Sequence, residues 1–96
     1  MRRQKVEKLG DVISQYLKAL RIDKKMKQVS LISAWEEIIG RNVARATNEI
    51  FFKKRILFVY LNSAVIRNEL LMIKDELKKR LNEHAGENLV DDIVIR

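Results

Sequence analysis

Cysteine and proline are absent from this 96-residue chain, which has only three glycines and one histidine. Without cysteine the chain can form no disulfide framework, no thiolate metal site and no thiol nucleophile. Small secreted domains usually rely on disulfides, so we expect a cytoplasmic protein. No apolar run approaches the roughly 20 residues of a membrane span, and the N-terminal residues lack the apolar core of a signal peptide. We therefore expect no membrane partner.

Groups that support catalysis or cofactor binding are equally scarce. His84 lies near the expected C-terminus of a helix, where a helix-capping role is favoured over proton transfer. Asp91 and Asp92 are neighbours in an expected strand, so they point to opposite faces and favour a solubilising role over a metal pair. The three glycines lie too far apart for a phosphate-binding loop. The sequence predicts no enzyme, no metal, no cofactor and no small-molecule substrate.

The length and the even composition predict a single domain over residues 1–96. Hydrophobic residues make up 47% of the chain and charged residues 34%, which is enough for one modest core and a well-solvated surface. No linker, repeat or low-complexity stretch divides it.

Apolar residues spaced three and four apart predict two N-terminal helices. The first covers Lys5–Arg21, and its stripe is Val6, Leu9, Ile13, Tyr16, Leu17 and Leu20. A basic loop is expected at Asp23–Lys27, followed by a second helix with apolar residues from Val29 to Ile39 and Gly40 as its C-terminal cap. Trp35 lies on that second stripe and is expected to be a core anchor, the alternative being a stacking platform for a base. Residues 41–46 add another helical turn or run out as extended chain.

The second half of the chain predicts three strands and one helix. Residues 47–52 and 56–61 are rich in aromatic and branched residues and read as a β-hairpin. The second of these strands is apolar on both parities, which predicts a central strand covered on both faces. Ser63 and Asn62 supply an N-cap for a helix that ends at Gly86, and residues 89–95 form the closing strand. The fold class is α+β in the order α-α-β-β-α-β, with a small three-stranded mixed sheet packed with helices.

The net charge of +7 is concentrated in the first part of the chain. Residues 1–60 carry 14 Lys and Arg against 6 Asp and Glu, whereas residues 61–96 carry 6 against 7. A positive excess of this kind attracts polyanions and can position a protein on phosphates without reading sequence. The alternative is a surface that only keeps the protein in solution. The candidate phosphate contacts form three groups: Lys53, Lys54 and Arg55; Arg41 and Arg45; and Lys24, Lys25 and Lys27.

Three segments resemble the bacterial DciA-like family, long classed as a domain of unknown function. Trp35-Glu36-Glu37-Ile38-Ile39-Gly40 resembles the family's Trp-x-x-Ile-Val-Gly element, and residues 57–63 and 69–82 follow in matching order over nearly the whole chain. The resemblance implies a K-homology-like domain, DNA binding, and recruitment or loading of the replicative helicase. The Gly-x-x-Gly loop of true K-homology domains is missing, so base-by-base reading of single strands is not implied. The sequence also stops after its last strand, whereas many members continue into a basic tail.

These observations favour a non-enzymatic accessory protein of DNA replication that holds single-stranded or branched DNA and engages the replicative helicase through one helical face. One alternative is a protein-interaction adaptor whose partner docks on the first helix. Another is an RNA- or ribosome-associated module. The sequence leaves open the preference for DNA or RNA, the oligomeric state and the face that binds the partner.

Overall fold

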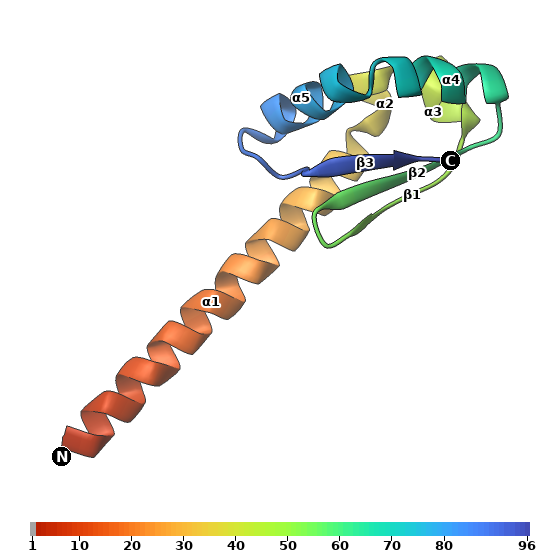
Figure 1. Ribbon diagram of the computed structural model, residues 1–96. Helices are drawn as coiled ribbons and strands as arrows, with labels where there is room; N and C mark the ends of the chain where they lie inside the picture. Colours follow the sequence, from red (N-terminus) through yellow and green to blue (C-terminus); the bar gives the residue numbers. More distant parts are fainter. Residues whose placement is uncertain (1) are drawn as a thin grey trace.

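The computed structural model describes residues 2–96, in which one long helix leads into a layer of short helices over a three-stranded sheet (Figure 1). The predicted α+β class with a small mixed sheet is confirmed. In chain order the elements are α1 (Arg2–Ser33), α2 (Trp35–Ile39), α3 (Arg41–Ala46), β1 (Thr47–Lys53), β2 (Ile56–Leu61), α4 (Ala64–Met72), α5 (Lys74–Ala85) and β3 (Asp92–Ile95).

Helix α1 runs without interruption through the stretch predicted to be a basic loop, so that prediction is wrong. Lysine, methionine and glutamine are good helix formers, and no glycine or proline lies between Asp11 and Ile39 to end the helix. Asp23 and Lys27 form an ion pair at 3.4 Å at the spacing that one helical turn brings together. The helix ends at Ser33, nearly two turns beyond Lys27, and the Ala34 N–H donates to the carbonyl oxygens of Ser30 and Leu31.

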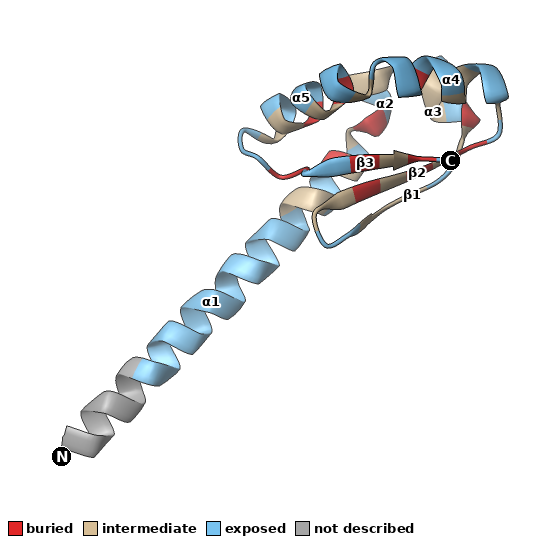
Figure 2. Cartoon of the chain, viewed as in Figure 1, coloured by how far each residue is buried: buried red, intermediate tan, exposed pale blue. Residues whose placement is uncertain are grey.

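Most of α1 projects away from the rest of the protein, and the whole molecule measures 66 × 21 × 18 Å. Every residue from Gly10 to Met26 is exposed (Figure 2). The predicted helix is therefore confirmed, but the described part of its apolar stripe packs against nothing in this chain. Only the last turns, beginning with Leu31, join the core. No helix among residues 2–96 is both long and apolar enough to cross a membrane.

The sheet has the order β1-β2-β3, which places β2 in the centre as predicted. Strands β1 and β2 form the predicted antiparallel hairpin, with Lys53 opposite Ile56 at its tip. Strand β3 runs parallel to β2, with Ile93 opposite Leu57. It begins at Asp92, three residues later than predicted.

All the short helices lie on one face of the sheet (Figure 1). From β2 the side chains of Leu57, Val59 and Leu61 are buried against them, whereas Phe58 and Tyr60 on the opposite face are only half-buried. The prediction that β2 is covered on both faces is therefore wrong, because the only layer of short helices that the structure describes lies on one face of the sheet. The core consists of Leu31, Trp35, Ala46, Leu57, Val59, Leu61, Leu70, Leu77, Leu81, Leu89, Val90, Ile93 and Ile95.

The helical caps follow the sequence closely. The Ser63 hydroxyl accepts a hydrogen bond from the Ile66 N–H at 3.3 Å and begins α4. Gly86 ends α5 with a φ of 76°, in the left-handed region that favours glycine. The single helix predicted between them is broken at Ile73, which has neither proline nor glycine beside it. Residues 41–46, left open by the sequence, form the helix α3.

Trp35 is 5% exposed and belongs to the core, which confirms its predicted role as an anchor. Its indole Nε1–H donates to the Thr47 hydroxyl at 3.0 Å. That hydroxyl in turn donates to the Val43 carbonyl at 2.8 Å. The indole thus ties α2 to the junction of α3 and β1, and it is not available to stack on a base.

Candidate nucleic-acid interface

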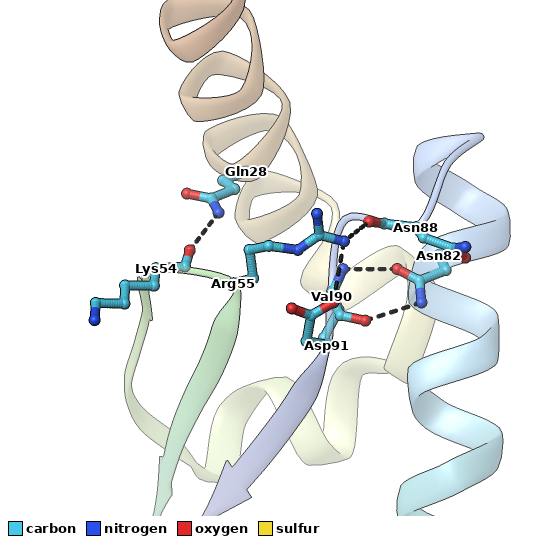
Figure 3. A network of polar contacts seen from close by, with 7 residues as sticks. All are labelled: Gln28, Lys54, Arg55, Asn82, Asn88, Val90 and Asp91. Carbon is cyan, nitrogen blue, oxygen red and sulfur yellow. Dashed lines mark hydrogen bonds and ion pairs between the residues drawn. The ribbon is translucent and has the colours of Figure 1, made fainter.

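The hairpin tip presents three consecutive cations between two apolar strands, as expected. Lys54 and Arg55 form the two-residue turn, and Lys53 ends β1. Lys54 has a φ of 59°, a conformation in which glycine or asparagine is commoner. The Gln28 side-chain amide of α1 donates to the Lys54 carbonyl at 2.7 Å and holds the turn against that helix (Figure 3). Both lysines are exposed, and neither forms an ion pair with a side chain that the structure describes.

Arg55 differs from its neighbours because its guanidinium is engaged within the molecule (Figure 3). Its Nη2 lies 3.0 Å from Asp91 Oδ1 and also donates to the Asn88 carbonyl. The Arg55 carbonyl accepts a hydrogen bond from the Asp91 N–H at 2.9 Å. Arg55 therefore joins the hairpin tip to the loop between α5 and β3. Sequence reasoning treated the three tip residues alike and missed this second role, for which Asp91 was the available signal.

The lysines predicted in a loop lie on α1, where they point to different sides. Lys24 lines a surface hollow together with Arg55 and Asn88, so it is close to the hairpin tip. Lys25 lines an apolar hollow with Ile22 and Met26 on another side of the helix. The structure thus brings Lys24 to the tip group and leaves Lys25 apart from it.

Lys27 connects α1 to the loop after α5. Its ammonium lies 2.8 Å from Glu87 Oε2 and 3.4 Å from Asp23 Oδ2. The hydrogen bond to Glu87, followed by the charges of Asp23 and Glu87, raises the pKa of Lys27 above its ordinary value. The charge of Lys27 is therefore balanced locally, and this side chain is less available to a phosphate than Lys53 or Lys54.

Arg41 and Arg45 lie one turn apart on α3, which leads directly into β1. The hairpin tip is at the other end of β1, about 20 Å away at the usual rise per strand residue. Arg41 Nε is 3.7 Å from Glu36 Oε1, a loose and exposed pair. The structure therefore separates the candidate cations into a tip group, defined as Lys24, Lys53, Lys54 and Arg55, and a distant α3 pair.

Asp91 and Asp92 have different partners, which fits the expectation that these neighbours point to opposite faces. Asp91 pairs with Arg55, and Asp92 Oδ1 lies 3.2 Å from the Lys74 ammonium. The hydrogen bond from the Ile93 N–H, followed by that from Lys74, lowers the pKa of Asp92. Among the side chains that the structure describes, those of residues 10–96, no three metal-ligating groups gather in one place. His84 lies in the last turn of α5, where it was expected.

Sequence reasoning also missed the uncovered face of the sheet. Phe51, Phe58 and Tyr60 lie there and contact one another, outside the buried core. Strand β1 carried a signal for this open face. Glu49 and Lys53 lie two residues on either side of Phe51 and therefore share its face of the sheet. Charged residues at such positions are typical of a solvated face.

Comparison with known proteins gives one curated relative and one family. A protein described as "UPF0232 protein" from Corynebacterium glutamicum (strain R) is 25% identical over 89 residues, or 93% of this chain. The chain spans about half the length of that relative, 50%. No solved structure matches the chain.

The family described as "Dna[CI] antecedent, DciA" matches residues 8–95. The match includes the Trp35 element, the hairpin and the helices that pack on the sheet, the same segments on which the sequence resemblance rests. The family is linked to loading of the replicative helicase and is not a known enzyme family. Because the match extends over nearly the whole sequence, this chain belongs to the DciA family.

Proposed function

We propose that this protein is a non-enzymatic accessory protein of DNA replication that binds single-stranded or branched DNA and helps to recruit or load the replicative helicase. Membership of the DciA family supports the link to the helicase. The observation that carries the DNA-binding part is the hairpin tip. There Lys53 and Lys54 are exposed and unpaired among the described side chains, on a turn fixed by the sheet and by Gln28.

The tip group supplies the primary phosphate contacts in this proposal. Lys53 and Lys54 donate to phosphate oxygens, and Lys24 extends the positive surface onto α1. Arg55 contributes charge, but its hydrogen bonds to Asn88 and Asp91 also hold the tip in place. Contacts of this kind fix position and register without reading sequence. The remaining cations, Lys25, Lys27, Arg41 and Arg45, serve as secondary contacts for a longer or branched strand.

The helicase, in this proposal, docks on α1. The exposed fractions of Ile13, Tyr16 and Leu17 are 53%, 63% and 52%, so a stripe of large apolar side chains faces solvent. An apolar stripe on a projecting helix is suited to a groove or helix of another protein. The same observation favours the second candidate function, a protein-interaction adaptor that docks a partner on α1 and uses its positive charge only for solubility.

Two measurements made together test the proposal. The first is the affinity of the purified protein for single-stranded DNA, forked DNA and RNA of equal length over a range of salt concentrations. The second is capture of the purified replicative helicase by the immobilised protein. Salt-sensitive DNA binding together with helicase capture is the expected result. Helicase capture without DNA binding would support the adaptor, and a preference for RNA without helicase capture would favour the RNA- or ribosome-associated module.

A further inference from the structure

The face of the sheet opposite the helices carries a row of aromatic side chains that lie outside the buried core. Phe51 of β1 lies directly opposite Phe58 of β2, and Tyr60 is the next residue of β2 on that face. The centroids of the Phe51 and Phe58 rings are 5.1 Å apart, with an angle of 5° between the planes. The Phe51 and Tyr60 centroids are 6.0 Å apart, with an angle of 17°. The rings therefore form a row with nearly parallel planes.

Packing within this chain does not explain the row. The thirteen residues of the core include Leu57, Val59 and Leu61 of β2 but none of the three aromatic residues. The helices lie on the other face, and α1 leads away from the sheet (Figure 1). All three rings are half-buried, so each leaves part of its apolar surface in contact with water, which is costly. Flat rings with a common orientation are suited to stacking on another flat group.

The charges around the row favour an anionic occupant. Lys53 is two residues from Phe51 on the same face of β1, and Lys54 follows it at the turn. At the opposite end Arg96 continues the ladder beside Tyr60, because its N–H donates to Val59 and its carbonyl accepts from Leu61. Of the acidic side chains on this face, Asp92 is paired with Lys74, and Glu49 lies opposite Tyr60. Unpaired cations at the tip end lie next to aromatic rings.

We propose that this face binds single-stranded DNA, with bases stacked on the rings of Phe51, Phe58 and Tyr60 and phosphates passing Lys53 and Lys54. Every base has a flat aromatic surface, so stacking of this kind tolerates any sequence. It complements the phosphate contacts of the hairpin tip, because the row begins where the tip ends. The inference rests on the proposed DNA-binding function and names the surface that performs it.

The test compares two oligonucleotides with the same number of phosphates. One is oligo(dT) of roughly 12 nucleotides, within the usual site size of a single small domain. The other is an abasic oligonucleotide of the same length. The wild-type protein should bind oligo(dT) at least about 5-fold more tightly, since loss of stacking on one base costs at least that much. This comparison requires no variant, so it does not depend on whether a substituted protein folds.

A variant then locates the effect. Phe51→Leu together with Tyr60→Leu keeps apolar side chains on the sheet but removes two rings of the row. Because Phe58 remains, this variant should bind oligo(dT) at least about 5-fold more weakly than the wild-type protein does, while its affinity for the abasic oligonucleotide stays unchanged. The control is Leu71→Ala, because Leu71 is 47% exposed on α4, in the helical layer over the other face of the sheet. It should keep the full preference for oligo(dT).

The outcomes separate this inference from the function on which it rests. Equal binding of both oligonucleotides by the wild-type protein would overturn the stacking face and leave phosphate binding at the tip intact. Binding of neither would overturn the proposed DNA-binding function and the stacking face together. Tighter binding of oligo(U) than of oligo(dT) would overturn DNA as the occupant. A dimer of the wild-type protein that Phe51→Leu with Tyr60→Leu dissociates would assign the face to a second copy of the chain.

Discussion

Trp35 begins α2, a helix that contacts α1, α3 and α5, and its side chain is buried in the core. We expect Trp35→Ala to lower the free energy of unfolding by about 3 to 5 kcal/mol, because it removes a large buried side chain and leaves a cavity. A domain of this size has little more stability than that. Urea unfolding followed by circular dichroism measures the change. Trp35→Phe retains the ring volume better and should lose only about 1 to 2 kcal/mol.

A Trp35→Ala protein with the stability of the wild type would contradict the assignment of the indole to the core. If such a protein also lost DNA binding, the indole would instead be a surface contact.

Asn82 holds the chain between α5 and β3 through two hydrogen bonds to one residue (Figure 3). Its amide nitrogen donates to the Val90 carbonyl at 3.1 Å, and its amide oxygen accepts from the Val90 N–H at 2.8 Å. Val90 is buried, so Asn82→Ala leaves both backbone groups without a partner and should lower the stability by about 2 to 4 kcal/mol. The matched control is Asn62→Ala, because the Asn62 amide bonds only to exposed Asn48. Equal midpoints of chemical unfolding for the two variants would show that the Asn82 contacts contribute nothing.

Asp92 predicts a small acid dependence of stability. Its pKa is lowered in the folded protein by the Ile93 N–H and by Lys74, so folding favours the ionised form. This contribution is complete above the ordinary pKa of an aspartate and is lost as the pH falls through the lower value of the folded protein. The carboxylate is 55% exposed, which limits the effect to roughly 0.2 to 1 kcal/mol. Wild type and Asp92→Asn should differ in unfolding midpoint at pH 6, and the difference should shrink as the pH falls below the ordinary pKa of an aspartate. A difference that stays constant through that fall would contradict the assignment.

At the scale of elements, sequence signals that depend on a few neighbouring residues predicted the structure better than expectations that depend on tertiary contacts. Branched and aromatic residues predicted the hairpin, and Ser63 and Gly86 predicted the caps, because each is a choice made by a few neighbouring residues. The basic stretch 23–27 reads as a loop in the sequence, because lysines are solvated equally well in a loop and in an exposed helix. The spacing of Asp23 and Lys27 was the remaining signal for a helix. The break at Ile73 has no marker in the sequence, since no glycine or proline accompanies it.

For the candidate interface, too, the local features could be predicted from the sequence and the tertiary arrangement could not. Its cations could be found in the sequence as three groups, but which groups meet depends on the direction of α1 and on the length of β1. The continuous helix brings Lys24 beside the hairpin tip. The length of β1 separates Arg41 and Arg45, on α3, from that tip. The open sheet face could not be predicted from β2 alone, because its apolar residues on both parities suit a strand covered on two faces.

Helix α1 contains two leucines that should differ greatly in their contribution to the free energy of unfolding. Leu17 is 52% exposed, so Leu17→Ala should change the free energy of unfolding by less than about 0.5 kcal/mol. Leu31, on the same helix but 3% exposed, should lose about 2 to 5 kcal/mol on the same substitution. Unfolding of both variants at two protein concentrations measures the difference. A large, concentration-dependent loss for Leu17→Ala would show that the stripe is buried in an assembly of this chain.

At the scale of the whole molecule, both the charge and the shape are asymmetric. The first 60 residues hold 14 of the 20 Lys and Arg residues, and they build α1 and the hairpin. The remaining part is close to neutral and supplies much of the core. A field of one sign over one part of a small protein speeds its encounter with a polyanion, and salt weakens that effect. The positive charge, the tip group and the aromatic face together support a surface for a single nucleic-acid strand.

The chain contains the run Lys-Lys-Arg twice, at 53–55 on the hairpin tip and at 78–80 on α5. This repetition separates position from net charge. Lys53→Gln with Lys54→Gln removes two exposed cations from the tip while Arg55 still holds the turn. Lys79→Gln with Arg80→Gln removes two exposed cations from α5 and gives a protein of identical net charge.

The most direct test is the salt dependence of binding to oligo(dT), measured for the wild type and for these two variants. Each phosphate contact contributes about 0.7 to the slope of log affinity against log salt concentration for a single strand. The tip variant should therefore lose about 1.4 units of slope and bind more weakly at low salt. The α5 variant should retain both slope and affinity. Equal losses in the two variants would show that only net charge matters and would contradict phosphate binding at the hairpin tip.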